Sequence, residues 1–176
     1  KKAILIIKKN KIKINSETIL SINSINRVSS SNVYSPSNYP AANNSSFDGY
    51  AINSKETKNL TKKKFEKFKI LKTIAAGDNP NIKKVPKYST LEVMTGAMIQ
   101  KPFDTVIPIE QINFVRSKDG TRYIIINKKI RKNEFIRFKG SDYKKGEIIL
   151  KKGQLIEPKH ILVMKTLGVK KVYVKK

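Results

Sequence analysis

Hydrophobic and polar positions follow two different patterns in this chain of 176 residues. In the middle, short apolar runs alternate with turn residues, a pattern typical of strands. Lys118-Asp119-Gly120 separates two such runs and predicts a β-hairpin. Many short strands at this spacing favour a small barrel or sandwich. The strands are predicted at residues 50–52, 68–75, 90–94, 105–109, 112–115, 123–126 and 135–138.

Helical patterns occur nearer the two ends. Ser16 is a suitable N-cap, and the loose stripe of isoleucines that follows it predicts a helix over 16–26. Pro158 suits the first turn of a second helix, over 158–167, and Gly168 suits its end. This second helix places His160 on its polar side, where a lone histidine makes no metal site. Strands are predicted on either side of this helix, at 146–150 and 169–174.

The run Ser35–Pro40 is rich in turn-forming residues and marks a crossing between domains. We expect the two end helices to pack together as one domain, with the β-rich middle inserted. The domains are then 1–45 plus 141–176, and 46–140. Residues 53–67 are basic and polar, which indicates an exposed loop or a ragged helix.

The chain is strongly basic, with a formal net charge of +25 from 38 basic and 13 acidic residues. Such a charge suggests a surface that binds nucleic acid or an anionic membrane. However, most of the basic residues are lysines, spread along the whole chain with many isoleucines and asparagines, so a nucleotide bias explains them more simply. There are no cysteines, which excludes disulfides, and no apolar run long enough to span a bilayer.

Three separated polar turns carry the candidate chemistry. The first, within Asn43–Ile52, holds Asp48 followed by a glycine that lets the backbone take a positive φ. The second places Thr95 before a glycine and interrupts an apolar strand pattern. The third, within Ile136–Asp142, ends on an aspartate. Each turn can also be explained by turn chemistry alone.

Five stretches follow one another along the chain: NNSSFDGYAI, FKILKTIAAGDNP, EVMTGAMIQKPFDTVIPIEQI, IRFKGSDYKKGEIILKKGQLIEP and LGVKKVYV. Together they resemble the MoeA-type molybdopterin molybdotransferases, the molybdenum-insertase family that includes the gephyrin E domain. The family pattern reads DNSAMDGYA, AG, an MTGA-containing stretch, NIRxxGED and LG. The resemblance runs from about Ser16 to Val174. It departs at Asn43, at Phe135, at Ser141 and in the loop 99–103, whereas Asp104 matches an aspartate of the pattern.

The resemblance implies an elongated, mixed α/β discontinuous domain with an inserted β-barrel-like domain, and a helix over residues 2–9. It also implies that the chain is the N-terminal portion of a longer enzyme, without the molybdopterin-binding α/β domain and the final β-domain, and inactive alone. That enzyme inserts molybdate into adenylylated molybdopterin, assisted by Mg²⁺. A homodimer, a molybdopterin adenylyltransferase partner and a cytoplasmic location are further implications.

The resemblance also assigns roles to residues of the three turns. Asp48, Thr95 and Asp142 are the predicted catalytic residues. The predicted substrate-binding residues are Ser45, Gly49, Tyr50, Gly96 and Arg137, and the residues that would bind the metal are left open. Two alternatives stay open: a basic module that binds RNA or DNA through the β-rich middle, and a non-catalytic scaffold.

Overall fold

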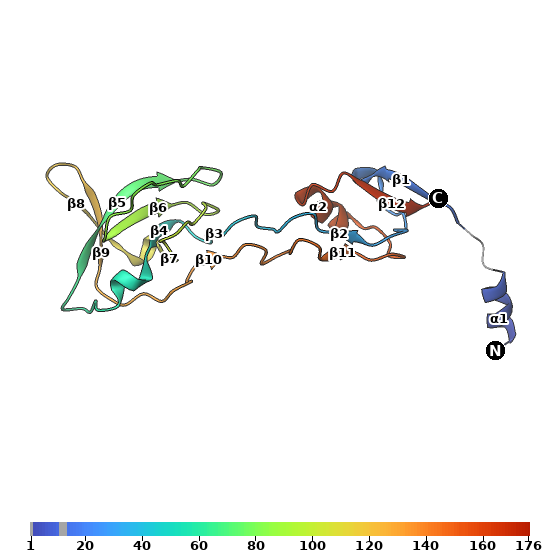
Figure 1. The fold of residues 1–176 in the computed structure, drawn as a ribbon, viewed down its shortest axis with the longest axis horizontal. Coiled ribbons are helices and arrows are strands. Elements are labelled where there is room, and N and C mark those ends of the chain that lie inside the picture. Colours follow the sequence, from blue (N-terminus) through green and yellow to red (C-terminus); the bar gives the residue numbers. More distant parts are fainter. Residues whose placement is uncertain (1, 11–13) are drawn as a thin grey trace. The chain divides into compact units, whose positions relative to one another are not determined.

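The computed structural model of the chain describes residues 2–10 and 14–176. Residue contacts group the chain into two compact units, one formed by Lys1–Asn38 with Tyr143–Lys176 and the other by Tyr39–Asp142. Figure 1 shows the elements of each unit. The sequence-based boundaries, after residues 45 and 140, stay a prediction.

The unit Tyr39–Asp142 is built on one six-stranded sheet with the order β7-β4-β6-β5-β9-β8. Strands β5 and β6 run parallel, and all other neighbours run antiparallel. The sheet is open and curled, with β7 and β8 at its edges (Figure 1). Its strands are β4 (Gly49–Ile52), β5 (Glu66–Ile74), β6 (Ser89–Val93), β7 (Thr105–Pro108), β8 (Asn113–Arg116) and β9 (Arg122–Ile126).

Apolar side chains are buried on both faces of this sheet. All four residues of β4 are buried, as expected for a strand enclosed between two neighbours. Successive side chains point to opposite faces. Tyr50 and Ile52 therefore join the cluster around Phe68, while Ala51 joins the cluster around Leu91. The two clusters hold β4 in the middle of the unit. The turn that precedes β4 is therefore held in place as well.

Shorter elements complete this unit. A two-stranded ribbon pairs β3 (Asn44–Ser45) with β10 (Ile136–Arg137) in antiparallel register. Two 3₁₀ turns, η2 (Ser54–Thr57) and η3 (Ile109–Gln111), follow β4 and β7. The ribbon connects the first polar turn to the third by backbone hydrogen bonds.

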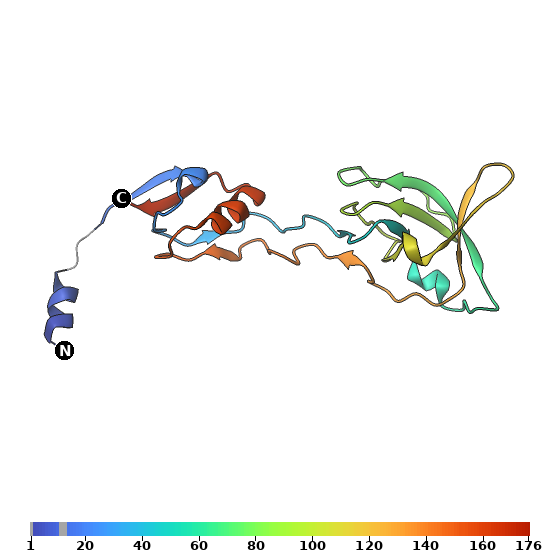
Figure 2. The same cartoon turned by 180° about the vertical axis from the view of Figure 1, so that it is seen from behind.

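The other unit contains two small sheets and one helix. Strand β1 (Ser16–Leu20) pairs with β12 (Lys171–Lys175), and β2 (Val33–Tyr34) pairs with β11 (Ile148–Leu150). The helix α2 (Pro158–Thr166) packs beside η1 (Ser21–Asn23) and β11. Both views show α2 next to β2 and β11 (Figures 1 and 2). A separate helix, α1 (Lys2–Lys9), precedes these elements.

Most of the predicted elements are confirmed. Helices were expected over 2–9 and 158–167, and the structure has α1 and α2 there. Each predicted strand of the middle region overlaps an observed one, and Lys118–Gly120 does connect the antiparallel pair β8 and β9. Pro158 begins α2 and Gly168 follows it with a φ of 77°. Residues 53–67 contain η2 rather than a uniformly exposed loop, since Ser54, Thr57 and Leu60 are buried.

The predicted helix over 16–26 is wrong. Residues 16–20 form strand β1, and only a single 3₁₀ turn, η1, follows. Pairing with β12 overrides the helical stripe, because Ile19 packs against the core of this unit while Ile22 and Ile25 remain exposed. The hydroxyl of Ser21 donates to the carbonyl of Val169 and fixes the turn.

The expected polar position of His160 is also wrong. Its side chain is buried, with 8% of its surface exposed. The backbone N–H of Glu157 donates to His160 Nδ1 over 3.0 Å, so the ring closes the first turn of α2. A capping interaction, which apolar periodicity does not reveal, turns the histidine inward.

The fold is mostly sheet, with few helices. The β-rich middle is confirmed. The predicted mixed α/β character of the first domain is confirmed only in part, because this unit has two small sheets, β1–β12 and β2–β11, and one packed helix. Within residues 2–10 and 14–176, none of the helices has both the length and the apolar character that crossing a bilayer requires.

Candidate functional site

Asp48 and Thr95 are in direct contact, although 47 positions separate them in sequence. The backbone N–H of Thr95 donates to Asp48 Oδ1 over 2.6 Å, and the threonine hydroxyl donates to the same oxygen over 2.9 Å. Strand register explains the contact. Gly49, which opens β4, pairs with Val93, which ends β6, so the residues just outside the two strands meet.

Gly49 fits where no larger residue would. A Cβ at this position would lie 2.1 Å from the carbonyl oxygen of Ile107, in the neighbouring strand β7. On the other side of the turn, the N–H of Ile109 donates to the carbonyl of Asp48 over 3.0 Å. The glycine therefore lets β7 approach closely, and the approach fixes the backbone that carries the Asp48 carboxylate.

Gly96 and Ser45 connect the backbone of the two turns that carry Thr95 and Asp48. Gly96 has a φ of 83°, a conformation that glycine adopts without strain, and its N–H donates to the carbonyl of Ser45 over 2.9 Å. The buried hydroxyl of Ser45 donates to the carbonyl of Phe47 over 2.6 Å. These hydrogen bonds connect the backbone beside Thr95 to the backbone beside Asp48, so Ser45 and Gly96 have a structural role. Their predicted role in substrate binding stays a prediction.

The Asp48 carboxylate is exposed and held in its ionised form. The hydrogen bond from the Thr95 N–H, and secondly the one from the Thr95 hydroxyl, lower the pKa of the Asp48 carboxyl below its usual value. Both bonds end on Oδ1. Within the described residues, Oδ2 receives no hydrogen bond, so it can accept one from a ligand.

Asp142 lies in a second cluster, with Arg137. The guanidinium donates to both carboxylate oxygens of Asp142, and the Ser141 hydroxyl donates to Oδ1 over 3.0 Å. This pairing lowers the pKa of the Asp142 carboxyl and raises that of Arg137. The guanidinium also lies over the ring of Tyr39, at 5.5 Å from its centroid.

Among the described residues, no hydrogen bond or ion pair joins Asp142 to Asp48 or Thr95. The two clusters share one backbone ribbon instead, in which Ser45 pairs with Ile136 and Asn44 pairs with Arg137. The sequence placed the three predicted catalytic residues in three separated turns. The structure brings Asp48 and Thr95 into contact, and connects Asp142 to them only through β3 and β10.

Tyr50 is almost fully buried, with 2% of its surface exposed, so its ring belongs to the core. Burial, and secondly the charge of Glu92, raise the pKa of the Tyr50 hydroxyl. Beside it, Glu92 accepts hydrogen bonds from Thr73 at 2.5 Å and Arg122 at 3.0 Å. The predicted contact of Tyr50 with substrate stays a prediction, although this position favours a structural role.

Asn44 is a residue that the sequence analysis did not single out. Its side-chain Oδ1 is buried and has no hydrogen-bond partner among the described residues. Such an atom costs free energy. It lies in β3, directly before Ser45, where the pattern of the first polar turn could have drawn attention to it. No metal cluster can be assigned here: residues 2–10 and 14–176 contain no group of three or more potential His, Cys, Asp or Glu ligands.

Comparison with known proteins agrees with the sequence resemblance. A family model described as "MoeA N-terminal region (domain I and II)" matches residues 1–168. A molybdopterin molybdenumtransferase of Staphylococcus aureus strain Mu50 is 32% identical over 151 residues, which are 86% of this chain and 35% of the relative. The Haemophilus influenzae molybdopterin molybdenumtransferase is 33% identical over 152 residues, covering 84% of this chain and 34% of the relative.

A solved structure gives the same result. The molybdopterin biosynthesis MoeA protein from Pyrococcus horikoshii superimposes with a TM-score of 0.88 at 27% identity, over 99% of this chain and 43% of that protein. A second crystal structure of the MoeA protein from this organism gives a TM-score of 0.80 at 28% identity, over 92% of this chain and 41% of that one. The chain thus spans about a third of the length of the curated relatives it matches.

Proposed function

Because this chain belongs to the MoeA family, as its N-terminal region, we propose that it supplies one wall of the active-site cleft of a molybdopterin molybdenumtransferase. The substrates are adenylylated molybdopterin and molybdate, and the product is molybdenum cofactor. The observation that carries the proposal is the exposed carboxylate of Asp48, held by both polar groups of Thr95 in the motif region that matches the family.

The geometry favours one of the chemical roles open to Asp48. A carboxyl whose pKa is lowered by two hydrogen bonds is a weak base, so it takes up a proton poorly at neutral pH. It is a good acceptor, however, because one oxygen is fixed and the other is available. We therefore assign Asp48 to accepting a hydrogen bond from an N–H group of the pterin. Thr95 is then a positioning residue, since its two donors point to Asp48.

Asp142 and Arg137 act together in this proposal. Their bidentate pairing neutralises the aspartate and presents a planar guanidinium beside Tyr39. The guanidinium and the ring form a flat polar surface suited to a phosphate or a pterin edge. The alternative is that the pair only fixes the turn after β10.

Mg²⁺ is implied by the family resemblance. Within the described residues, Asp48 belongs to no group of three or more potential His, Cys, Asp or Glu ligands. Mg²⁺ is usually held by one or two carboxylates together with substrate phosphates. We therefore assign no ligand set to Mg²⁺ and derive no step through it.

Oligomeric state and location are part of the same proposal. We propose a homodimer, because the unit containing α2 exposes several large apolar side chains, and isologous dimers commonly bury such surface. These residues are Leu20, Ile22, Ile25, Leu162 and Tyr173. A molybdopterin adenylyltransferase that delivers the substrate and a cytoplasmic location complete the proposal.

The test uses the whole enzyme and compares two aspartates in matching settings. Asp119, in the β8–β9 hairpin, also accepts hydrogen bonds from a threonine N–H and hydroxyl, those of Thr121, at 3.0 Å each. Asp48→Asn is expected to abolish most molybdate insertion, whereas Asp119→Asn is expected to leave it unchanged. Dimerisation and thermal unfolding should be the same in both variants. Unchanged insertion in Asp48→Asn would reject the proposed role of Asp48 and favour a scaffold.

A further inference from the structure

A cavity of about 510 Å³ lies within the unit Tyr39–Asp142, apart from the Asp48–Thr95 pair. Its walls come from four segments that are distant in sequence: the start of the first polar turn, η2, the loop that precedes β7, and the residues before β10. That loop includes residues 99–103, where the chain departs from the family pattern. Neither Asp48 nor Thr95 lines this cavity.

Three lysines and one aspartate line the cavity, so its charge is positive. The lysines are Lys55, Lys101 and Lys132, all exposed, and none forms an ion pair within the described residues. The aspartate is Asp104. Its two carboxylate oxygens accept hydrogen bonds from the N–H of Ser54 at 2.7 Å and from the Ser54 hydroxyl at 3.0 Å. The acid is thus already engaged, whereas the three ammonium groups are available.

Two asparagines add further donors. Asn43 Oδ1 accepts from the N–H of Lys139 at 2.9 Å, and Asn53 Oδ1 accepts from the N–H of Lys55 at 3.2 Å. Both asparagines line the cavity with their carbonyl oxygens occupied. Each side chain therefore has its amino group left to donate. The polar lining is rich in donors and poor in acceptors, which suits an anion.

Apart from Asn133, the rest of the lining is apolar. Pro102 is exposed and Ile136 is half-buried, whereas Ile99 and Phe103 expose only 8% and 4% of their surfaces. A lone oxyanion would leave much of the space unfilled, since cavities of roughly 300–1,000 Å³ are typical of small organic ligands. A lining that combines hydrogen-bond donors with apolar side chains matches a molecule with an anionic group and an apolar body.

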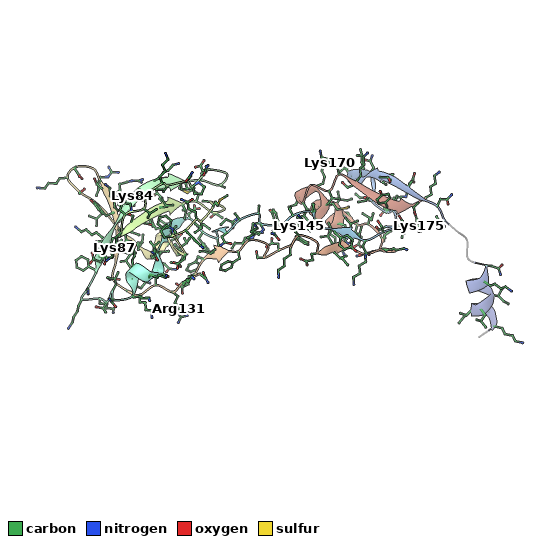
Figure 3. All side chains as sticks on the ribbon, in the orientation of Figure 1. Lys84, Lys87, Arg131, Lys145, Lys170 and Lys175 are labelled. Carbon is green, nitrogen blue, oxygen red and sulfur yellow. The ribbon has the colours of Figure 1, made fainter. Side chains whose placement is uncertain are left out.

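We propose that this cavity is a binding site for a small phosphate ester, with the phosphate held by Lys55, Lys101 and Lys132 and the organic part against Pro102 and Ile136. Lysine abundance alone does not explain the arrangement. Basic residues occur on both units, as the labels of Figure 3 show, but here they coincide with donor-only amides and an apolar wall. The site is independent of the proposed transfer of molybdenum.

Binding of phenyl phosphate to the 176-residue chain at fixed ionic strength tests the proposal, with inorganic phosphate and phenol as partial ligands. We expect phenyl phosphate to bind saturably and more tightly than either partial ligand. The triple variant Lys55→Ala, Lys101→Ala, Lys132→Ala should weaken its binding by about tenfold or more. The control variant Lys62→Ala, Lys63→Ala, Lys118→Ala removes the same charge from exposed positions outside the cavity and should bind as the wild type does.

Equal weakening in both triple variants would overturn the proposal, because it would show general attraction to a basic surface. Absence of saturable binding, or equal binding of phenol, would also overturn it. Circular dichroism of both variants checks that they fold. An independent measurement on the unaltered chain is the change in amide NMR shifts: phenyl phosphate should move those of Asn53 and Asn133, and unmoved shifts there would contradict the site.

Discussion

Thr95 donates both its backbone N–H and its hydroxyl to a single oxygen of Asp48, at 2.6 and 2.9 Å. Neither residue is buried, so burial does not fix this contact. It is fixed by the register between β4 and β6, which places Gly49 opposite Val93. The ionisation of Asp48 therefore depends on a strand pairing, and it can be changed without touching the aspartate.

Thr95→Val is expected to raise the pKa of the Asp48 carboxyl toward its ordinary value, but only in part. Valine removes the hydroxyl donor and keeps the N–H, which is the larger cause of the lowered pKa. Thr95→Ser should restore the wild-type value. The measurement is a carbon-13 NMR titration of the side-chain carboxyl. Titration of Asp48 at the same pH in Thr95→Val and wild type would show that the hydroxyl has no effect.

The β8–β9 hairpin supplies the control for this experiment. Thr121→Val removes the equivalent hydroxyl from Asp119, whose pKa is lowered first by Ser117 and then by Thr121. This change should alter the titration of Asp119 and leave that of Asp48 unaffected. A shift at Asp48 in the hairpin variant would mean that general charge effects, not the local bonds, set its pKa.

Gly49→Ala is expected to destabilise the chain severely, by about 3 kcal/mol or more, because the new Cβ would lie 2.1 Å from the Ile107 carbonyl oxygen. Strand β7 would have to move away from β4, and the Asp48 backbone with it. Urea unfolding measures the free energy. Gly120→Ala is the control: a Cβ there meets nothing within 4 Å, so only the strain of its φ of 83° remains. Equal losses in the two variants would contradict the steric argument.

The strands of the middle region could be predicted from sequence because their signal is local. Phe68 and Ile70, two residues apart, are both buried in β5, and Lys118–Gly120 has the residues of a tight turn. The parallel pairing of β5 with β6 could not be predicted in this way, since it depends on non-local register. The helix expected over 16–26 failed for the same reason, because β12 pairs with residues from the far end of the chain.

The sequence indicated candidate residues for the site but not their arrangement, and the roles of these residues stay a prediction. Asp48 and Thr95 stood out as polar residues beside glycines, and the structure places them in contact. Asp142 and Arg137, five positions apart, pair across a turn, and sequence spacing does not distinguish this structural pairing from a role in catalysis. The first polar turn could have drawn attention to Asn44, but the missing partner of its Oδ1 is a property of packing that only the structure reveals.

Phe68→Ala should lower the free energy of unfolding by about 3–5 kcal/mol, because this ring of β5 is fully buried in an apolar cluster. The ring also makes an edge-to-face contact with Tyr88 at 5.4 Å between centroids, which is lost as well. Phe65→Ala is the matched control, since that ring is 53% exposed and should cost less than about 1 kcal/mol. Similar costs for both changes, measured by urea unfolding, would show that the sheet does not bury Phe68 as described.

Arg137→Gln is expected to make the stability of the chain less dependent on pH in the acid range. In the wild type, hydrogen bonds from Arg137 lower the pKa of the Asp142 carboxyl in the folded state. A lowered folded-state pKa adds stability above the unfolded-state value of 3.8, and this stability is lost as the pH falls through the folded-state value.

The variant should therefore unfold slightly more easily than the wild type at neutral pH, and the difference should disappear toward the acid end. The effect is small, because both side chains are more than a third exposed and solvent screens the pair. Thermal unfolding from pH 7 down to pH 2 measures it, and Arg116→Gln, in an exposed strand with no ion pair in the described residues, is the control. A difference between Arg137→Gln and wild type that grows as the pH falls has the wrong sign for this ion pair and would refute it.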